Sequence, residues 1–262
     1  NKEVCCIILS VKTYIFSERH TVDFMKRIPM RAKYISRFVF RLAVLAVILV
    51  MYFLRSEAFR VLNGFNFFRQ FTLLHIIWII WTVSMIMQVV PTRNLVSIGS
   101  QKQFGVHYID TEIPYCPDTL KHHTKQSGLG AIKVLLLWLA LTAVIGVLKK
   151  ASVIDNRLLL VIITVFYVCD LICVLFWCPF KEWIMKNRCC NTCRIFNWDY
   201  FMMFLPGIFC KGFFTISLLA MSLITLAIWE IYNMKYPERF WEGSNDAIKC
   251  RNCTEYLCGR RK

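Results

Sequence analysis

The sequence predicts an all-α fold: a polytopic transmembrane helix bundle of about five spans, with an interfacial or re-entrant half-helix before the last span. Of the 262 residues, 57% are hydrophobic and only 18% are charged, whereas soluble domains average roughly 45–50% and about 25%. The apolar residues are concentrated in five segments, and no internal repeat or soluble domain lies between them. These segments are residues 38–54, 71–90, 129–148, 158–180 and 200–231.

The lengths of these segments match the thickness of a bilayer. A helix crosses the hydrocarbon core with roughly 20 apolar residues, because its backbone polar groups must be satisfied within the segment. The second, fourth and fifth segments reach this length directly. The first and third reach it only if Arg41 and Lys133 extend their charged ends toward the lipid headgroups.

The chain divides into three parts. Residues 1–34 form a basic N-terminal segment, residues 35–234 the transmembrane helical domain, and residues 235–262 a basic tail rich in cysteine. Residues 1–24 are interpreted as an upstream extension, because Met25 or Met30 opens a conventional basic leader. The first span lacks a small-residue cleavage site and is expected to be retained. Residues 91–130 are expected to form a polar loop that caps the cytoplasmic face.

Lys and Arg residues near the span ends predict the orientation. With the N-terminus on side A, residues 1–41, 91–130 and 178–200 hold nine, four and four of these residues, seventeen in all. Side B holds six, three in residues 55–70 and three in residues 149–157. The excess predicts that side A, with the N-terminus, is cytoplasmic, as in a multi-pass protein of the bacterial inner (plasma) membrane.

The last apolar segment leaves two topologies open. A single crossing would put the tail, with seven more Lys and Arg residues, on side B. Pro206, Gly207 and Gly212 interrupt the segment near its middle, and such residues break helices. A half-helix that dips into the membrane or lies at its surface would return the tail to side A, giving a count of twenty-four to six.

Two cysteine clusters are candidates for a metal centre. In a reducing cytoplasm, closely spaced cysteines indicate metal binding or catalysis more than structural disulfides. A C-x2-C turn directs two thiolates to one point, which makes half of a zinc or iron–sulfur site. The nearby Lys and Arg residues lower the pKa of the thiols. The candidate ligands are Cys189, Cys190 and Cys193, Cys250, Cys253 and Cys258, and Cys178 at the end of the fourth span.

Three other cysteines have a simpler interpretation. Cys169, Cys173 and Cys210 lie within apolar segments, where a thiol commonly packs as a small hydrophobic side chain. We therefore expect these three to be packing residues. The two candidate clusters could share one site only if the tail returns to side A.

An intramembrane polar pair is the second candidate site. Asp170 falls near the middle of the fourth segment, where a charged carboxylate is costly and often functional. His75 in the second segment is a natural partner if the two helices are neighbours. Such a pair could relay protons or bind a cation, and Asp170 could equally be a protonated group that bonds a neighbouring helix.

The leading hypothesis is a cytoplasmic cysteine-ligated iron–sulfur centre related to electron transfer, because a closed zinc site needs only four ligands and this chain offers more. The alternatives are a small transporter or channel-like protein with a structural zinc site, and a membrane thiol–disulfide oxidoreductase. The sequence assigns no catalytic residue. Expected partners are the lipid bilayer and a redox protein or membrane complex. Nucleic acid is disfavoured, because a net charge of +16 also fits cationic loops on anionic lipids.

Several motifs carry a resemblance. "KNRCCNTCRIFNWD", "MMF", "YPERFWE" and the terminal C-x2-C-x4-C resemble a family of bacterial multi-pass membrane proteins of uncharacterised activity. The resemblance covers most of the chain from Arg188 onward and implies a membrane protein without naming a reaction. The "FWCP" sequence around Cys178 is also similar to membrane ferredoxin-like subunits, but the full C-x2-C-x2-C-x3-C-P motif of those subunits is absent here.

Overall fold

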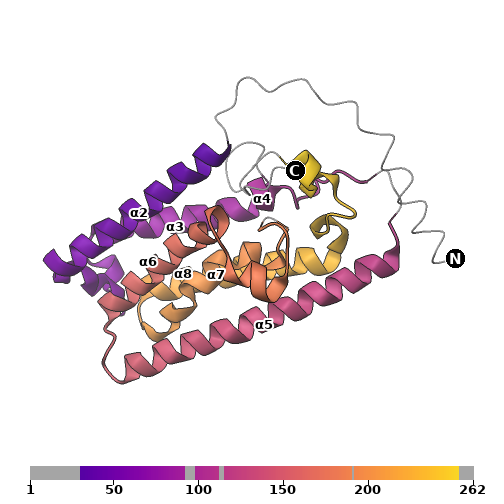
Figure 1. The fold of residues 1–262 in the computed structure, drawn as a ribbon. Helices are drawn as coiled ribbons and strands as arrows, with labels where there is room; N and C mark the ends of the chain where they lie inside the picture. The colour runs from indigo at the N-terminus through magenta and orange to yellow at the C-terminus, as the bar shows by residue number, and fades with distance from the viewer. Residues whose placement is uncertain (1–29, 92–97, 112–114, 191, 254–262) are drawn as a thin grey trace.

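The structure, a computed structural model, describes residues 30–91, 98–111, 115–190 and 192–253. Its framework is a set of long helices that run side by side (Figure 1). Within the described residues the chain is helical and forms no strand, only two isolated bridges. The long helices are α2 (Met30–Leu54), α3 (Leu73–Val89), α5 (Pro117–Lys150), α6 (Asn156–Leu175) and α8 (Phe213–Lys235).

Short helical segments connect the long ones. Two, η1 (Ser56–Leu62) and η2 (Asn66–Phe68), lie between α2 and α3, and α4 (Ile98–Gln101) follows α3. The chain between α6 and α8 contains the π-helical turn η3 (Phe180–Met185), η4 (Arg194–Trp198), α7 (Asp199–Phe204) and η5 (Leu205–Phe209). After α8 come η6 (Pro237–Phe240), η7 (Asp246–Ile248) and η8 (Cys250–Asn252).

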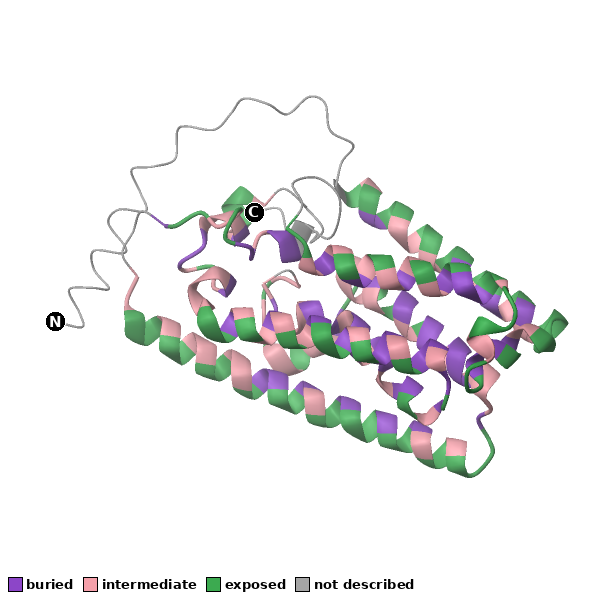
Figure 2. Ribbon diagram, turned by 180° about the vertical axis from the view of Figure 1, so that it is seen from behind, coloured by how far each residue is buried: buried purple, intermediate pink, exposed green. Residues whose placement is uncertain are grey.

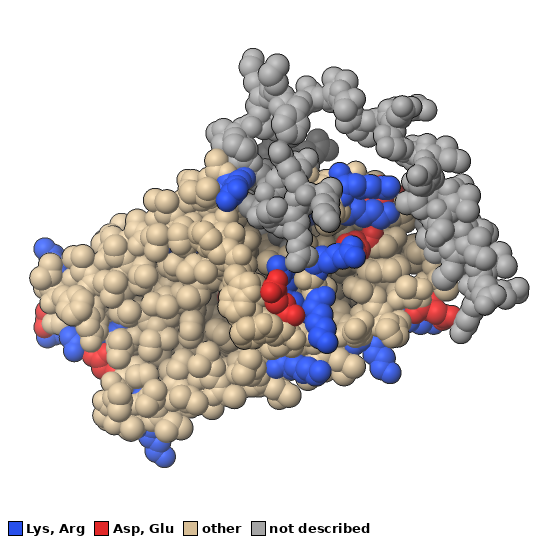
Figure 3. All heavy atoms as spheres, in the orientation of Figure 1, with Lys and Arg blue, Asp and Glu red and all other residues tan. Residues whose placement is uncertain are grey.

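Four of the helices, α2, α5, α6 and α8, are long and apolar enough to cross a membrane. Helix α3 is also apolar but has only 17 residues. The outward faces of the bundle carry large exposed apolar side chains, such as Val39 and Phe53 on α2 and Leu136 and Val147 on α5. Figures 2 and 3 show these exposed faces and an uncharged band between two charged ends. This is the surface expected of a protein surrounded by lipid.

Contacts between connecting segments define the two ends of the bundle. At one end, Asn63 and Gly64 contact Asn156 and Lys211, with a Gly64 N to Lys211 O distance of 3.0 Å. At the other end, the Asp246 amide donates to Ile109 O at 2.8 Å. The first end contains the α2–α3 and α5–α6 connections and is side B as defined above. The second contains the α3–α5 connection and the segment after α8, and is side A.

Helices α6 and α8 both run from side B to side A, so the chain between them must return. It does so through α7 and η5, which pack against α6, α8 and α5 (Figure 1). At its end the Phe213 amide donates to Gly64 O at 2.9 Å. A Cβ on Gly212 would lie 1.9 Å from Leu62 O, so this close backbone approach requires glycine.

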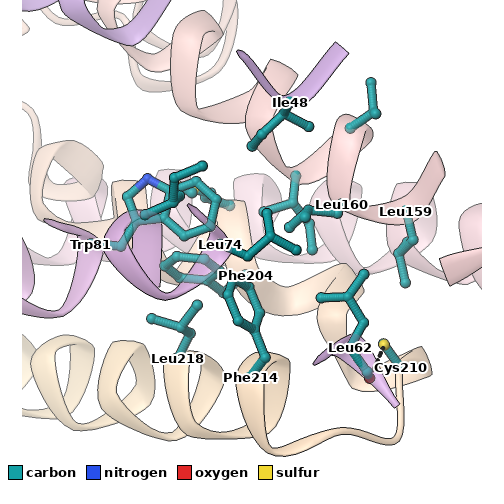
Figure 4. Close-up of a cluster of buried hydrophobic side chains, with 14 of the residues drawn as sticks. Ile48, Leu62, Leu74, Trp81, Leu159, Leu160, Phe204, Cys210, Phe214 and Leu218 are labelled. Atoms are coloured by element: carbon teal, nitrogen blue, oxygen red, sulfur yellow. Dashed lines mark hydrogen bonds between the residues drawn. The ribbon is translucent and has the colours of Figure 1, made fainter. Parts of the chain in front are cut away.

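The centre of the bundle is a cluster of aromatic and branched side chains from α2, α3, α6, α7 and α8 (Figure 4). Trp81 is fully buried, and its ring meets the edges or faces of Tyr167, Phe204 and Phe214 at centroid distances of 5.8, 5.3 and 6.4 Å. In a bilayer the lipid is as apolar as these side chains, so close packing holds the helices together. This packing fixes α7 against α6 and α3.

Two helix boundaries differ from the sequence prediction. Helix α5 begins at Pro117, so residues 117–130 are helical and not loop. Proline is favourable at the first helical position, since its missing N–H would have no partner there. At 34 residues α5 is about 51 Å long, and its first polar turns extend beyond the apolar segment. Helix α6 ends at Leu175, so Asp170 lies near its end and not at its middle.

Candidate metal-binding thiol cluster

Five cysteines gather where α6 ends on side A. Cys173 lies in the last turn of α6, Cys178 follows the helix, and Cys189, Cys190 and Cys193 lie on the connection to η4. These five residues are called the thiol cluster below. The Cys178 sulfur lies within hydrogen-bonding reach of the Cys173 and Cys190 thiols, and the Cys190 thiol is also 3.5 Å from Cys173 O.

The backbone after Cys178 turns back toward its sulfur. The Lys181 amide donates to Cys178 Sγ at 3.4 Å, and the Phe180 amide donates to the same sulfur. Pro179 starts this tight turn, and η3 continues it. The hydrogen bonds from the Cys173 and Cys190 thiols and from the two amides hold the pKa of Cys178 well below its ordinary value. Cys178 is therefore the member of the thiol cluster whose surroundings most favour the thiolate form.

The C-x2-C pair forms a similar turn. The Cys193 amide donates to Cys190 O at 3.0 Å, and the Cys193 sulfur accepts from the Ile195 amide and the Asn187 side chain. Burial raises the pKa of Cys193 to about 12 despite these bonds. The hydrogen bond to the Cys178 sulfur raises the pKa of Cys190. The surroundings of both residues thus favour the protonated thiol.

Polar contacts anchor the turn that carries Cys193. Arg194 and the Trp198 indole N–H both contact Glu230 near the end of α8, the indole at 2.8 Å. Buried Asn197 accepts from Ser100 Oγ at 2.6 Å and donates to Gln103 Oε1 at 2.8 Å. These contacts connect the thiol cluster to α8 and to the segment after α3.

The structure does not bring all predicted ligands together. Cys178, Cys189, Cys190 and Cys193 belong to the thiol cluster, but Cys250 is exposed and Cys253 half-buried in the segment around η8. This segment is on side A, where Asp246 pairs with Lys249 and Arg251 at 2.6 and 2.9 Å. Cys258 lies outside the described residues.

Cys173 was expected to be a packing residue, and the structure instead places it beside Cys178. Within the described ranges, no three His, Cys, Asp or Glu side chains are arranged around one point as metal ligands are. The Cys178 sulfur is close to the thiols of Cys173 and Cys190. The described arrangement is therefore a hydrogen-bonded group of thiols around a thiolate.

The predicted Asp170–His75 pair is not formed, because each residue has other partners. Asp170 Oδ2 accepts from Arg41 Nη1 at 2.6 Å. His75 caps the start of α3, with Nδ1 3.0 Å from the Thr72 amide and Nε2 2.7 Å from Phe67 O. His75 thus lies at side B, and its role is to fix the entry into α3.

Arg41 was expected to extend to the lipid headgroups but is buried. Its Nη1 also donates to Tyr167 O at 2.6 Å, and its guanidinium carbon lies 4.1 Å from the centre of the Tyr167 ring. Near this pair, half-buried Asp199 accepts from Gln88 Nε2 at 2.9 Å. Asp199 and Gln88 were not among the predicted site residues, although each is a polar residue at the edge of an apolar segment.

Comparison of the chain with models of protein families, with curated proteins and with solved structures finds no match. The resemblance to bacterial multi-pass membrane proteins therefore stays a prediction. Any function assigned to the thiol cluster must rest on its own geometry and chemistry.

Proposed function

We propose that this multi-pass membrane protein binds a single zinc ion in the thiol cluster, and that the ion ties the end of α6 to the segment entering α7. The observation that carries the proposal is the environment of Cys178. Its sulfur contacts two further thiols and accepts two backbone N–H bonds. Thiolates that bind metals use such amide bonds to stabilise their negative charge.

The sulfur spacing favours one ion over a larger cofactor. With a Zn–S bond of about 2.3 Å, tetrahedral geometry separates neighbouring sulfurs by about 3.8 Å. This is close to the separation of thiols in hydrogen-bonding contact, so the ion could replace the protons between Cys173, Cys178 and Cys190 with little movement. An iron–sulfur cluster places iron and sulfide between its cysteines and needs them further apart. The closeness of the Cys173 and Cys190 thiols to the Cys178 sulfur therefore favours zinc over the iron–sulfur centre expected from sequence.

The proposed ligands are Cys173, Cys178, Cys190 and Cys193. Cys193 is the fourth because it is 4% exposed and its sulfur already accepts the Ile195 amide, two residues on, as Cys178 accepts Phe180. Four thiolates would bring a charge of −4 to a +2 ion. Lys181, which acts on Cys190, lies where it offsets part of that charge.

We also propose that side A is cytoplasmic, in a bacterial inner membrane. Support comes from the count of Lys and Arg, which is twenty-four to six when the tail is counted with side A. In the bilayer, α7 and η5 would form a half-helical segment that returns the chain from side A to side B, buried by α5, α6 and α8, with α3 completing about five spans. Irregular backbone is tolerated at membrane depth where protein surrounds it.

Metal analysis of the purified protein tests the zinc site. We expect one zinc per chain and no visible colour, and loss of the zinc in Cys173→Ser and Cys178→Ser. Cys169→Ser is the matched control, since Cys169 lies on the same helix but is exposed, and it should keep the metal. Visible absorption with iron and acid-labile sulfide would contradict zinc, and zinc loss in Cys250→Ser would contradict the ligand set.

Thiol redox chemistry is a second candidate, and the Cys178 thiolate beside the Cys190 thiol favours it. Oxidation of these two groups would form one disulfide, release the Cys190 proton and pass two electrons to an acceptor. Thiol counting under anaerobic conditions and after oxidation distinguishes the candidates. A zinc-bound site should keep all its thiols after mild oxidation, whereas a redox pair should lose two.

A further inference from the structure

The buried polar groups near side A contain more acid than base. Arg41 on α2 and Asp170 on α6 form an ion pair whose side chains are 12% and 27% exposed. Asp199 at the start of α7 is half-buried nearby and is influenced by both charges. If all three groups were ionised, the group would hold one net negative charge in a partly buried site, where an uncompensated charge is unfavourable.

The partners of Asp199 are neutral. Its Oδ1 accepts from Gln88 Nε2 at 2.9 Å, and the Tyr200 backbone amide also bonds the carboxyl group. Gln88 is 4% exposed, and its amide oxygen is buried without a hydrogen-bond partner. Leaving a buried carbonyl oxygen without a hydrogen bond is unfavourable. The Gln88 side chain therefore donates to Asp199 through its nitrogen, while its oxygen has no hydrogen-bond donor.

We infer that Asp199 binds a proton and that the neutral acid forms a two-hydrogen-bond pair with the Gln88 amide. The acid O–H donates to Gln88 Oε1, while Gln88 Nε2 continues to donate to the acid carbonyl. This single proton satisfies the unpaired oxygen and removes the excess negative charge. The Arg41–Asp170 pair then remains the one ionised pair of this group.

The charged and titratable groups around Asp199 do not compensate a negative charge on it. Helix α6 contributes Asp170, held by Arg41, and neutral Tyr167, which lies under the guanidinium. Two other elements, η4 and α8, pack against α7. Arg194 of η4 and Glu230 of α8 are paired with each other. The titratable and charged groups of the elements packed against α7 therefore either compensate one another or are neutral. This proton site is independent of the proposed zinc ion.

Infrared difference spectroscopy of the intact protein, between about pH 5 and pH 9, tests the inference. A protonated carboxyl group gives a C=O stretching band that shifts in D2O and vanishes when the proton leaves. We expect such a band in the wild type and its loss in Asp199→Asn. In Gln88→Met the band should move to higher frequency, because the acid carbonyl loses a donor. Absence of any band assignable to Asp199 across this range would overturn the inference.

Stability provides a second readout. Asn at position 199 mimics the neutral acid, since its amide can donate to Gln88 Oε1 and accept from Nε2. Asp199→Asn should therefore unfold at nearly the same detergent concentration as the wild type, whereas Asp170→Asn, which removes the partner of Arg41, should unfold clearly earlier. Equal destabilisation by the two substitutions would show that Asp199 is ionised, and would overturn the inference.

Discussion

Removing the positive charge of Arg41 is expected to destabilise the bundle more than removing any exposed cation. Arg41→Met keeps the length of the side chain but leaves Asp170 without its partner and Tyr167 O without its 2.6 Å donor. Breaking a buried ion pair costs roughly 3–5 kcal/mol. Because Asp170 is 27% exposed, water can reach part of the carboxylate, and we expect the lower end, about 3 kcal/mol.

The assay is unfolding in mixed micelles with increasing denaturing detergent. Arg157→Met is the matched control, because the Arg157–Asp155 pair is exposed, at 41% and 44%, and its loss should change stability very little. The double variant Arg41→Met/Asp170→Leu should recover most of the loss, since an apolar pair can replace a buried ion pair. If Arg41→Met costs no more than Arg157→Met, the buried-pair reasoning is refuted.

Three further outcomes are expected. In the same unfolding assay, Gly212→Ala should lower the free energy of unfolding by at least about 3 kcal/mol, because its Cβ would lie 1.9 Å from Leu62 O. Gly207→Ala is the control. Its Cβ would have neighbours only at 3.5 Å or more, and it should cost less than about 1 kcal/mol. Zinc affinity, measured by chelator competition, should rise from pH 6 to pH 8, because Cys193 with its raised pKa must lose a proton to bind; a flat profile would contradict this. Glu230→Gln removes the partner of Arg194 and should weaken zinc binding about 10-fold, and unchanged affinity would show that this contact does not position the thiol cluster.

Hydropathy was sufficient to predict an all-helical membrane protein, because the apolar segments are long and continuous. The interior contacts were not predictable in the same way. Arg41 looks like a residue that extends to the headgroups, and only the packing of α2 on α6 shows that Asp170 and the Tyr167 ring receive it. His75 looks like an intramembrane partner, yet its place in the first turn of α3 makes it a helix cap.

Only part of the thiol cluster was predictable from sequence, because only some of its cysteines are close neighbours in the chain. Spacing identified the Cys190–Cys193 turn, since short loops bring near neighbours together. Cys173 has no such local pattern, and its position depends on α6 ending at Leu175 and on η3 folding back after Pro179. Asp199 reads as an ordinary polar residue before an apolar segment, and its burial follows from the tertiary packing of α7 between α6 and α8.

X-ray absorption at the zinc edge of the purified, membrane-extracted protein tests the central claim most directly. The account predicts four sulfur ligands at about 2.3 Å, reduced zinc content in Cys178→Ser and an unchanged spectrum in Cys169→Ser. A zinc-free protein with all thiols titratable, or zinc bound by oxygen and nitrogen ligands, would contradict it.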